Sequence, residues 1–343
     1  MPTENDTPLT NDSGETQAVH PMPMCDPHFH MWDIPRRPNP NLGEAAAERL
    51  PTYLASDYAR DLGELPAPLQ RVSRVHVETI VGQMEGGFAL DSVDETRWVC
   101  AQLEPTAAEC PFAVVAYMHL ARDPAESERL LQQHIEVSGG RLRGVRMILN
   151  HHPDNADLTW PQVESGEFLR SGLWRQGLAL LERHNLAFDL SCNPHQIADA
   201  VQVLGDFPAL RVIVNHLGFL HDGEDETHER LWREGMGALA GLPNIYVKLS
   251  MLWFARDGYH QDAAKEAKVR ELVGEVIDLF GCDRCMFASN YPVDKFMGIG
   301  IGALYGKFLQ WSADRSDADR AALFHDTAMR AYGAFGWGGT SVK

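Results

Sequence analysis

The chain has 343 residues, of which 44% are hydrophobic and 23% are charged, an ordinary composition for a globular protein with a sizeable core. Its formal net charge of −18 and the lack of a basic stripe argue against a nucleic-acid partner. No apolar run reaches the roughly 18 residues of a membrane-crossing helix, and residues 1–20 lack the basic start and apolar core of a signal peptide. We therefore expect a cytoplasmic protein that acts on a small-molecule substrate and not at a membrane, with homo-oligomer formation left open.

The predicted elements begin after residues 1–20, a polar and acidic stretch that predicts a disordered tail. Eight later runs have the length and the β-branched or aromatic content of buried parallel strands: Met24–Trp32, Arg74–Val81, Phe112–Leu120, Leu142–Leu149, Leu186–Cys192, Leu210–His216, Ile245–Leu249 and Cys285–Ser289. Helices are expected at Leu90–Leu103, Glu126–Val137, Phe168–Asn185, Ile197–Leu204, His228–Ala240, Ala264–Phe280, Ala303–Trp311 and Asp317–Phe335.

This alternation predicts an α/β fold, a (β/α)8 TIM barrel that forms a single domain over residues 21–343. The rival architecture is a doubly wound open sheet, which usually carries a glycine-rich phosphate loop after its first strand. Here the first predicted strand ends in His30-Met31-Trp32-Asp33 instead. The long, proline-rich segment Ile34–Gln70 follows, and we expect it to form an insertion over the barrel mouth. Its aromatic residues Tyr53 and Tyr58 are candidates to stack on or hydrogen-bond the ligand, with ordinary packing as the favoured role for each.

Polar residues gather at the predicted strand ends, where barrel enzymes place their chemistry. In the motif Asp26-Pro27-His28-Phe29-His30, both histidines lie on one face because strand side chains alternate. Two converging imidazoles can bind one metal ion or hold an oxyanion. Further candidates lie at or after the other strand ends: Glu78, Thr79, His119, Arg146, His151, His152, His195, His216, Lys248, Ser250, Asn290 and Asp294.

The chain resembles the amidohydrolase superfamily, in particular the amidohydrolase-related (family 2) TIM-barrel hydrolases that include sugar lactonases and pyrone dicarboxylate lactonase. The run Asp26–Asp33 together with Asn215-His216-Leu217-Gly218 is the most specific part of the resemblance. It implies catalytic roles for His28, His30, His195 and His216. In metal-using relatives such groups bind divalent ions, whereas several similar lactonases need none. The resemblance is therefore compatible with one zinc ion, held by His28, His30 and His216, and with a metal-free site.

One position departs from the family pattern. Asn290 stands where the family usually ends its eighth strand with an aspartate, and an amide cannot act as a carboxylate base. Asn290 then orients substrate or water, or Asp294 substitutes for the aspartate, or the chemistry differs. A binuclear metal site is not expected, because Arg146 lies in the strand that carries the bridging lysine of binuclear relatives.

The leading hypothesis is a lactone-opening hydrolase, in which water attacks a ring ester carbonyl polarised by His28 and His30, directly or through zinc. Asp294 or His216 is the candidate base. The candidate substrate-binding residues are Arg146, His151, Lys248, Ser250 and Glu78. Internal ion pairs are the alternative for the two cations among them, with Glu78 and Asp189 as partners.

Two other functions stay open. A zinc-dependent non-oxidative decarboxylase is a different reaction on the same scaffold, and Asn290 argues against it because such relatives keep the aspartate. A barrel that has lost its base and only binds a ligand is the second alternative.

Overall fold

The computed structural model describes residues 21–38, 43–79, 88–223 and 226–334. The expected tail, residues 1–20, lies outside the described residues, as does the end of the second predicted strand at residues 80–81. Among the described residues, every helix is too short or too polar to cross a membrane.

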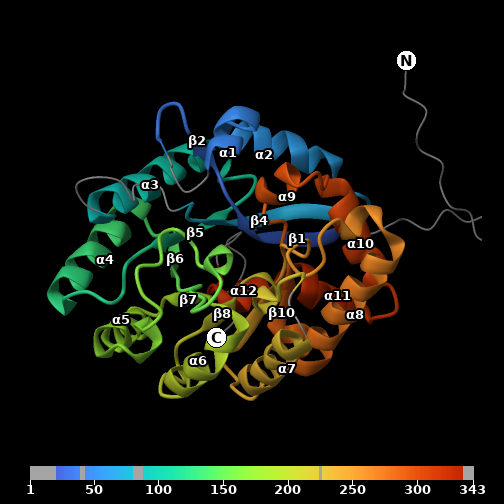
Figure 1. Cartoon of the computed structure of the whole chain (residues 1–343). Coiled ribbons are helices and arrows are strands. Elements are labelled where there is room, and N and C mark those ends of the chain that lie inside the picture. The colour runs from blue at the N-terminus through green and yellow to red at the C-terminus, as the bar shows by residue number, and fades with distance from the viewer. Residues whose placement is uncertain (1–20, 39–42, 80–87, 224–225, 335–343) are drawn as a thin grey trace, which may run out of the picture.

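Eight parallel strands form one sheet in which each strand pairs with the next, which confirms the predicted (β/α)8 barrel. The strands are β1 (Met22–Phe29), β4 (Leu69–Val77), β5 (Phe112–Tyr117), β6 (Leu142–Ile148), β7 (Ala187–Ser191), β8 (Val212–Val214), β9 (Ile245–Leu249) and β10 (Cys285–Phe287). Figure 1 shows the helices around the sheet: α3 (Phe88–Leu103), α4 (Pro124–Ser138), α5 (Gly172–Arg183), α6 (Ile197–Leu204), α7 (Glu226–Ala240), α8 (Ala263–Phe280) and α10 (Ile301–Trp311).

The barrel closes between β1 and β10 just beyond the end of β10. The backbone N–H of Asn290 donates to the carbonyl of His28 at 2.8 Å, and that of His30 donates to the carbonyl of Tyr291 at 2.6 Å. The buried carboxylate of Asp26 adds to this seam, because it accepts from both the backbone N–H and the hydroxyl of Ser289, at 2.9 and 2.6 Å. Closure therefore fixes the residues after β10 against the histidine motif of β1.

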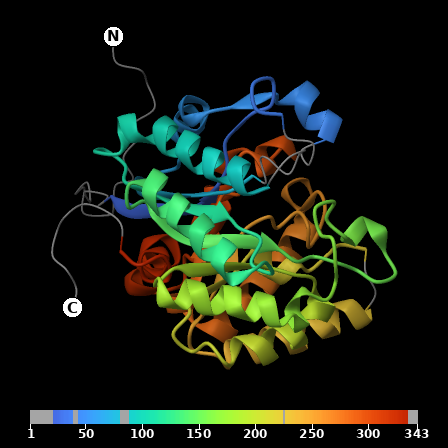
Figure 2. The same cartoon turned by 90° about the vertical axis from the view of Figure 1, so that its left-hand side faces the viewer.

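The C-terminal segment covers one end of the barrel interior (Figure 2). It comprises α11 (Asp317–Ala321), a π-helical turn (Ala322–Asp326) and α12 (Thr327–Ala331), where the sequence predicts one continuous helix. Ala328, Ala331 and Tyr332 pack against interior strand residues that include Ala113 and Ala187, at or near the amino ends of β5 and β7. The carboxyl ends of the strands are thereby left for a site, as is usual in this fold.

The segment after β1 forms the expected insertion. A short strand, β2 (Trp32–Asp33), pairs antiparallel with β3 (Thr52–Tyr53), and two helices accompany them, α1 (Gly43–Arg49) and α2 (Ala55–Asp61). Tyr58 is fully buried, stacks on Phe29 with ring centroids 4.1 Å apart, and donates to Asp26 at 2.6 Å. The hydroxyl of Tyr53 donates to Asp61 at 2.7 Å. Both tyrosines therefore pack and anchor the insertion, as the sequence suggests.

Candidate active site

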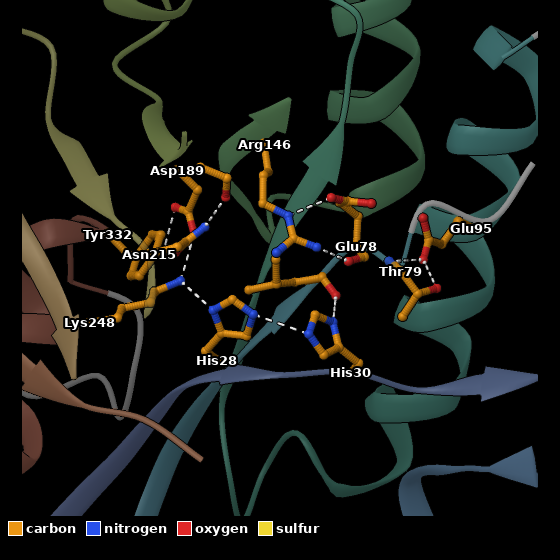
Figure 3. Close-up of polar contacts among 12 residues, drawn as sticks. His28, His30, Glu78, Thr79, Glu95, Arg146, Asp189, Asn215, Lys248 and Tyr332 are labelled. Atoms are coloured by element: carbon orange, nitrogen blue, oxygen red, sulfur yellow. Dashed lines mark hydrogen bonds and ion pairs between the residues drawn. The ribbon is translucent and has the colours of Figure 1, made fainter. Parts of the chain in front are cut away.

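His28 in β1 and His30 just after it meet in a chain of hydrogen bonds that defines where their protons lie (Figure 3). The Nδ1 atom of His30 lies 2.8 Å from the carbonyl oxygen of Val77, which can only accept, so this nitrogen carries the proton. The Nε2 atoms of the two rings are 3.1 Å apart; His30 accepts there and His28 donates. The remaining nitrogen of His28, Nδ1, then accepts from Lys248 Nζ at 3.2 Å. We assign both tautomers from these partners.

The chain continues into a buried ion pair. Lys248 Nζ donates to Asp189 Oδ2 at 2.6 Å, and both side chains are 0% exposed. The hydroxyl of Tyr332 donates to the two carboxylate oxygens of Asp189 at 2.7 and 3.0 Å. Burial lowers the pKa of Lys248 to about 8, while Asp189 acts to raise it. The C-terminal segment thus reaches the histidine motif through Asp189 and Lys248.

A second buried ion pair lies beside the histidines. Arg146 Nε donates to Glu78 Oε1 at 2.5 Å, and its Nη2 donates to the main-chain carbonyl of Glu78 at 2.7 Å. Arg146 and Lys248 therefore both form the internal ion pairs that the sequence left open as the alternative to substrate binding. Substrate-binding roles for Arg146, Lys248 and Glu78 remain predictions.

Both histidines of the motif are neutral at physiological pH. Burial lowers the pKa of His28 well below its ordinary value, and it lowers the pKa of His30 to about 3. The positive charges of Lys248 and Arg146 act in the same direction. Neutral rings each offer one donor and one acceptor nitrogen, so the direction of the hydrogen-bond chain decides what they can do.

His216 completes a group of three neighbouring imidazoles. Its ring centroid lies 4.6 Å from that of His28, and its Nδ1 lies 3.0 Å from the hydroxyl oxygen of Ser250. Burial also lowers the pKa of His216 well below the ordinary value. The structure thus brings together three predicted catalytic histidines, and it places Ser250 behind one of them.

An unusual backbone turn aims His216 at this group. Four successive residues, His216, Leu217, Gly218 and Phe219, have φ angles of 54, 55, 73 and 56°. This left-handed conformation costs roughly 1–2 kcal/mol for each residue that is not glycine. A Cβ atom at Gly218 would lie 2.6 Å from the sulfur of Met236, so any larger residue there would also force the Met236 side chain to move. The predicted strand Leu210–His216 ends early, at Val214, because the turn begins here.

Asn290 and Asp294 lie after the carboxyl end of β10 and contact each other there. Asn290 follows β10 with a left-handed φ of 53°, a conformation that asparagine tolerates well. Its Nδ2 donates to Asp294 Oδ2 at 2.8 Å, and the side chain of Trp253 lies close enough to Asp294 to act on its pKa against the effect of burial. Burial raises the pKa of Asp294 to about 8. Asn290 also acts on His30 and raises its pKa slightly against the effect of burial. The side chain of Asn290 therefore links the Asp294 carboxyl group to His30.

His195 and His151 are found in a different cluster. The ring of His195 contacts that of His152 with centroids 4.9 Å apart, and the neighbours that lower its pKa, after burial, are His152, His228 and His151. Within the described residues, no ring contact or hydrogen bond joins His195 to His28, His30 or His216. The catalytic role of His195 and the substrate-binding role of His151 stay predictions.

Several buried residues of the site have no recognisable sequence signal. Tyr332 directly follows α12 and makes its contact with β7 across 143 positions of the chain. Glu95 on α3 accepts from both the backbone N–H and the hydroxyl of Thr79, each at 2.8 Å, and burial raises its pKa to about 8. Asp26 could have been suspected, because an acidic residue stands in the middle of an apolar strand.

Comparison with known proteins identifies the family. The amidohydrolase family model matches residues 25–334. The chain belongs to this amidohydrolase family.

Relatives and solved structures cover nearly the whole amidohydrolase chain. The uncharacterised protein y4mH of Sinorhizobium fredii is 31% identical over 319 residues, which is 90% of this chain and 98% of the relative. An L-fucono-1,5-lactonase of Burkholderia ambifaria is 26% identical, over 90% of this chain and 94% of its own. The crystal structure of a Burkholderia multivorans amidohydrolase with bound zinc has a TM-score of 0.71 at 24% identity, covering 90% and 98% of the two chains. A 2,6-dihydroxybenzoate decarboxylase from Rhizobium shares the fold with a TM-score of 0.54 at 14% identity, covering 91% and 98%.

The zinc in the Burkholderia multivorans structure raises the question whether this amidohydrolase has a matching donor set. The two Nε2 atoms of His28 and His30 are 3.1 Å apart, close to the separation of about 3.3 Å that two nitrogens take on tetrahedral zinc. The described residues nevertheless contain no group of three or more His, Cys, Asp or Glu side chains placed to hold an ion. The side chains as arranged thus do not fit a complete zinc site. Zinc held by His28, His30 and His216 stays a prediction.

Proposed function

We propose that this amidohydrolase opens a lactone by attack of water on the ring ester carbonyl. The observation that carries the proposal is the hydrogen-bond chain that runs from Asp189 through Lys248, His28 and His30 to Val77. Its direction makes Nε2 of His28 a hydrogen-bond donor and Nε2 of His30 an acceptor, and these two nitrogens face each other. An ester carbonyl needs a donor and the attacking water needs an acceptor. Two L-fucono-1,5-lactonases, 26% and 27% identical over 90% of this chain, support the reaction class.

In this mechanism His28 donates its Nε2 proton in a hydrogen bond to the carbonyl oxygen of the substrate. Lys248 behind it keeps the proton on Nε2, and its positive charge favours the oxyanion that forms during attack. The substrate oxygen takes the place of His30 as the acceptor for His28. His30 Nε2 is then available to accept a hydrogen bond from the attacking water and orient it.

Asp294 is the proposed base. The water oxygen forms a bond to the carbonyl carbon while one water proton moves to the Asp294 carboxylate. When the tetrahedral intermediate collapses, the bond between this carbon and the ring oxygen breaks, and the proton passes from Asp294 to the leaving oxygen. The product is a hydroxy acid. Asn290 supports the base because its amide donates to Asp294 Oδ2.

Decarboxylation receives less support. The Rhizobium decarboxylase resembles this chain in fold alone, at 14% identity. A zinc-dependent decarboxylase would also require a complete metal site, which the described donor set around His28 and His30 does not provide.

The test is a panel of lactones assayed with metal-stripped protein and with zinc-loaded protein, following acid release. We expect hydrolysis of at least one lactone, and a loss of about 100-fold or more in His28→Ala. His325→Ala is the matched control, because His325 lies away from the strand ends, where its Nδ1 contacts the neighbouring Asp326. Failure of both preparations on every lactone, or full activity in a folded His28→Ala variant, would reject the proposed function.

A further inference from the structure

A series of aromatic side chains extends from His216 across the loops at the carboxyl ends of the strands. The ring of Phe219 lies 5.2 Å from that of His216, and Trp160 and Phe254 lie 6.3 and 6.1 Å from Phe219. Trp253 follows, 5.7 Å from Phe254. We call Trp160, Phe219, Trp253 and Phe254 the aromatic wall. Its members come from the loops after β6, β8 and β9, the loops that form substrate sites in barrels.

The two ends of the aromatic wall lie next to the proposed catalytic residues His216 and Asp294. At one end, Phe219 contacts His216, which in turn contacts His28. At the other, Trp253 is close enough to Asp294 to act on its pKa, in the direction opposite to burial. Trp160, Trp253 and Phe254 are only partly buried, unlike the rings of the core. They therefore keep apolar surface that a ligand could cover, next to the groups that would carry out the hydrolysis.

The charges at the site disfavour an anionic substrate. Arg146 and Lys248 are the cationic side chains that act on the pKa of His28, His30 and His216. Each is already neutralised by a buried carboxylate, Arg146 by Glu78 and Lys248 by Asp189. Drawing either cation toward a substrate carboxylate would leave its partner buried and unpaired, which is strongly unfavourable. Ionised Asp294 would repel such a substrate as well.

We propose that the substrate is an uncharged lactone with a flat apolar face, such as a lactone fused to an aromatic ring. This inference rests on the proposed lactone hydrolysis and adds the class of substrate. The flat face stacks on the exposed parts of the aromatic wall while the carbonyl oxygen points to His28. A sugar lactone fits less well, because its several hydroxyl groups need polar partners, whereas Phe219 and Phe254 offer none and each indole of Trp160 and Trp253 offers a single donor.

The test compares four lactones: isochroman-3-one, δ-valerolactone, L-fucono-1,5-lactone and 2-pyrone-4,6-dicarboxylate. The first two lactones both have six-membered rings and alkyl leaving groups. For each lactone, kcat/KM is divided by the rate constant for its hydrolysis by hydroxide in the absence of protein. This ratio removes the difference in intrinsic reactivity and leaves the effect of the fused aromatic ring on recognition. We expect isochroman-3-one to exceed δ-valerolactone by about tenfold on this scale, and to exceed the sugar lactone and the dicarboxylate as well.

Variants of Phe254 test whether the aromatic wall causes the preference for isochroman-3-one over δ-valerolactone. Phe254→Leu, which keeps an apolar side chain, should reduce the preference for isochroman-3-one over δ-valerolactone by about fivefold or more, whereas Phe254→Tyr should keep it. Phe207→Leu is the control, because Phe207 precedes β8 and lies toward the opposite end of the barrel. Better hydrolysis of L-fucono-1,5-lactone or the dicarboxylate, or an unchanged preference in Phe254→Leu, overturns this inference while leaving lactone hydrolysis standing. No hydrolysis of any lactone rejects the proposed function itself.

Discussion

Lys248 lies behind His28, with its ammonium nitrogen 3.2 Å from His28 Nδ1 and 2.6 Å from Asp189 Oδ2. An ammonium group can only donate, so this contact places the single proton of neutral His28 on Nε2, the nitrogen that faces His30. The relationship is one of position: Lys248 need not touch a substrate to decide which way His28 points its hydrogen bond.

Replacing Lys248 by methionine should separate this positioning from stability. The single variant leaves Asp189 buried without its cation, and we expect a loss of about 3–5 kcal/mol in the free energy of unfolding. The double variant Lys248→Met, Asp189→Asn removes the orphaned charge and should recover most of that stability. Lactone hydrolysis should stay about 100-fold low in both, because no ammonium group then holds the His28 proton on Nε2 once the substrate oxygen replaces His30, and no positive charge favours the oxyanion. Urea unfolding and kcat measured on the same preparations check this, and recovery of activity in the double variant would argue against the positioning role.

Tyr332→Phe should weaken the same chain from its other end. The variant removes a hydroxyl that donates to the buried Asp189 carboxylate at 2.7 and 3.0 Å. A hydrogen bond to a charged group contributes about 1.5–3 kcal/mol, so the free energy of unfolding should fall by that amount. Tyr246→Phe, at a partly exposed tyrosine of β9, is the control and should change it by less than about 0.5 kcal/mol. Equal stability of the two variants would show that the Tyr332 contact contributes nothing.

The fold and the convergence of His28, His30 and His216 could be predicted from the sequence, because both follow from local patterns. Alternating strands and helices specify the barrel, and the barrel brings strand ends together. The direction of the hydrogen-bond chain could not be predicted. It depends on ring orientations and on Tyr332, whose contact with Asp189 links distant parts of the chain that share no local pattern. His195 shows the complementary limit: its position after a strand was evident, but the 3-10 turn Pro194–Gln196 places its ring beside His152.

Activity should rise with pH through the titration of Asp294. Burial raises the pKa of this carboxyl to about 8, so the fraction present as a base is small at pH 6 and grows as the pH approaches that value. Burial also lowers the pKa of Lys248 to about 8, so the ammonium group behind His28 is lost above this pH and the rise in activity should end there. A raised pKa in the folded state also means that stability is greatest below the unfolded pKa and declines as the pH rises toward 8. Asp294→Asn should therefore lose activity at every pH and unfold at higher denaturant than the native protein at pH 8. Asp314→Asn, at an exposed carboxyl, is the control for both measurements. A native pH–rate profile that is flat from pH 6 to 9 would rule out Asp294 as the base.

Asn290→Asp should change the metal affinity and the pH dependence together. Asn290 Nδ2 lies 2.8 Å from Asp294 Oδ2, so a carboxylate at position 290 would face another carboxylate at hydrogen-bond distance. Two carboxyls so close share a proton, and the pKa of one of them rises further, so the activity of metal-free Asn290→Asp should begin to rise only at a higher pH than in the native protein.

The new carboxylate also lies beside His30, where it adds an oxygen donor to the two imidazole nitrogens. We therefore expect Asn290→Asp to retain close to one zinc ion per chain after dialysis, while the native protein and the isosteric control Asn290→Leu retain much less. Metal content by mass spectrometry, measured alongside the pH–rate profile, checks both effects. Equal zinc in the native protein and in the Asn290→Asp variant would mean that the identity of this one side chain does not decide whether the barrel holds a metal.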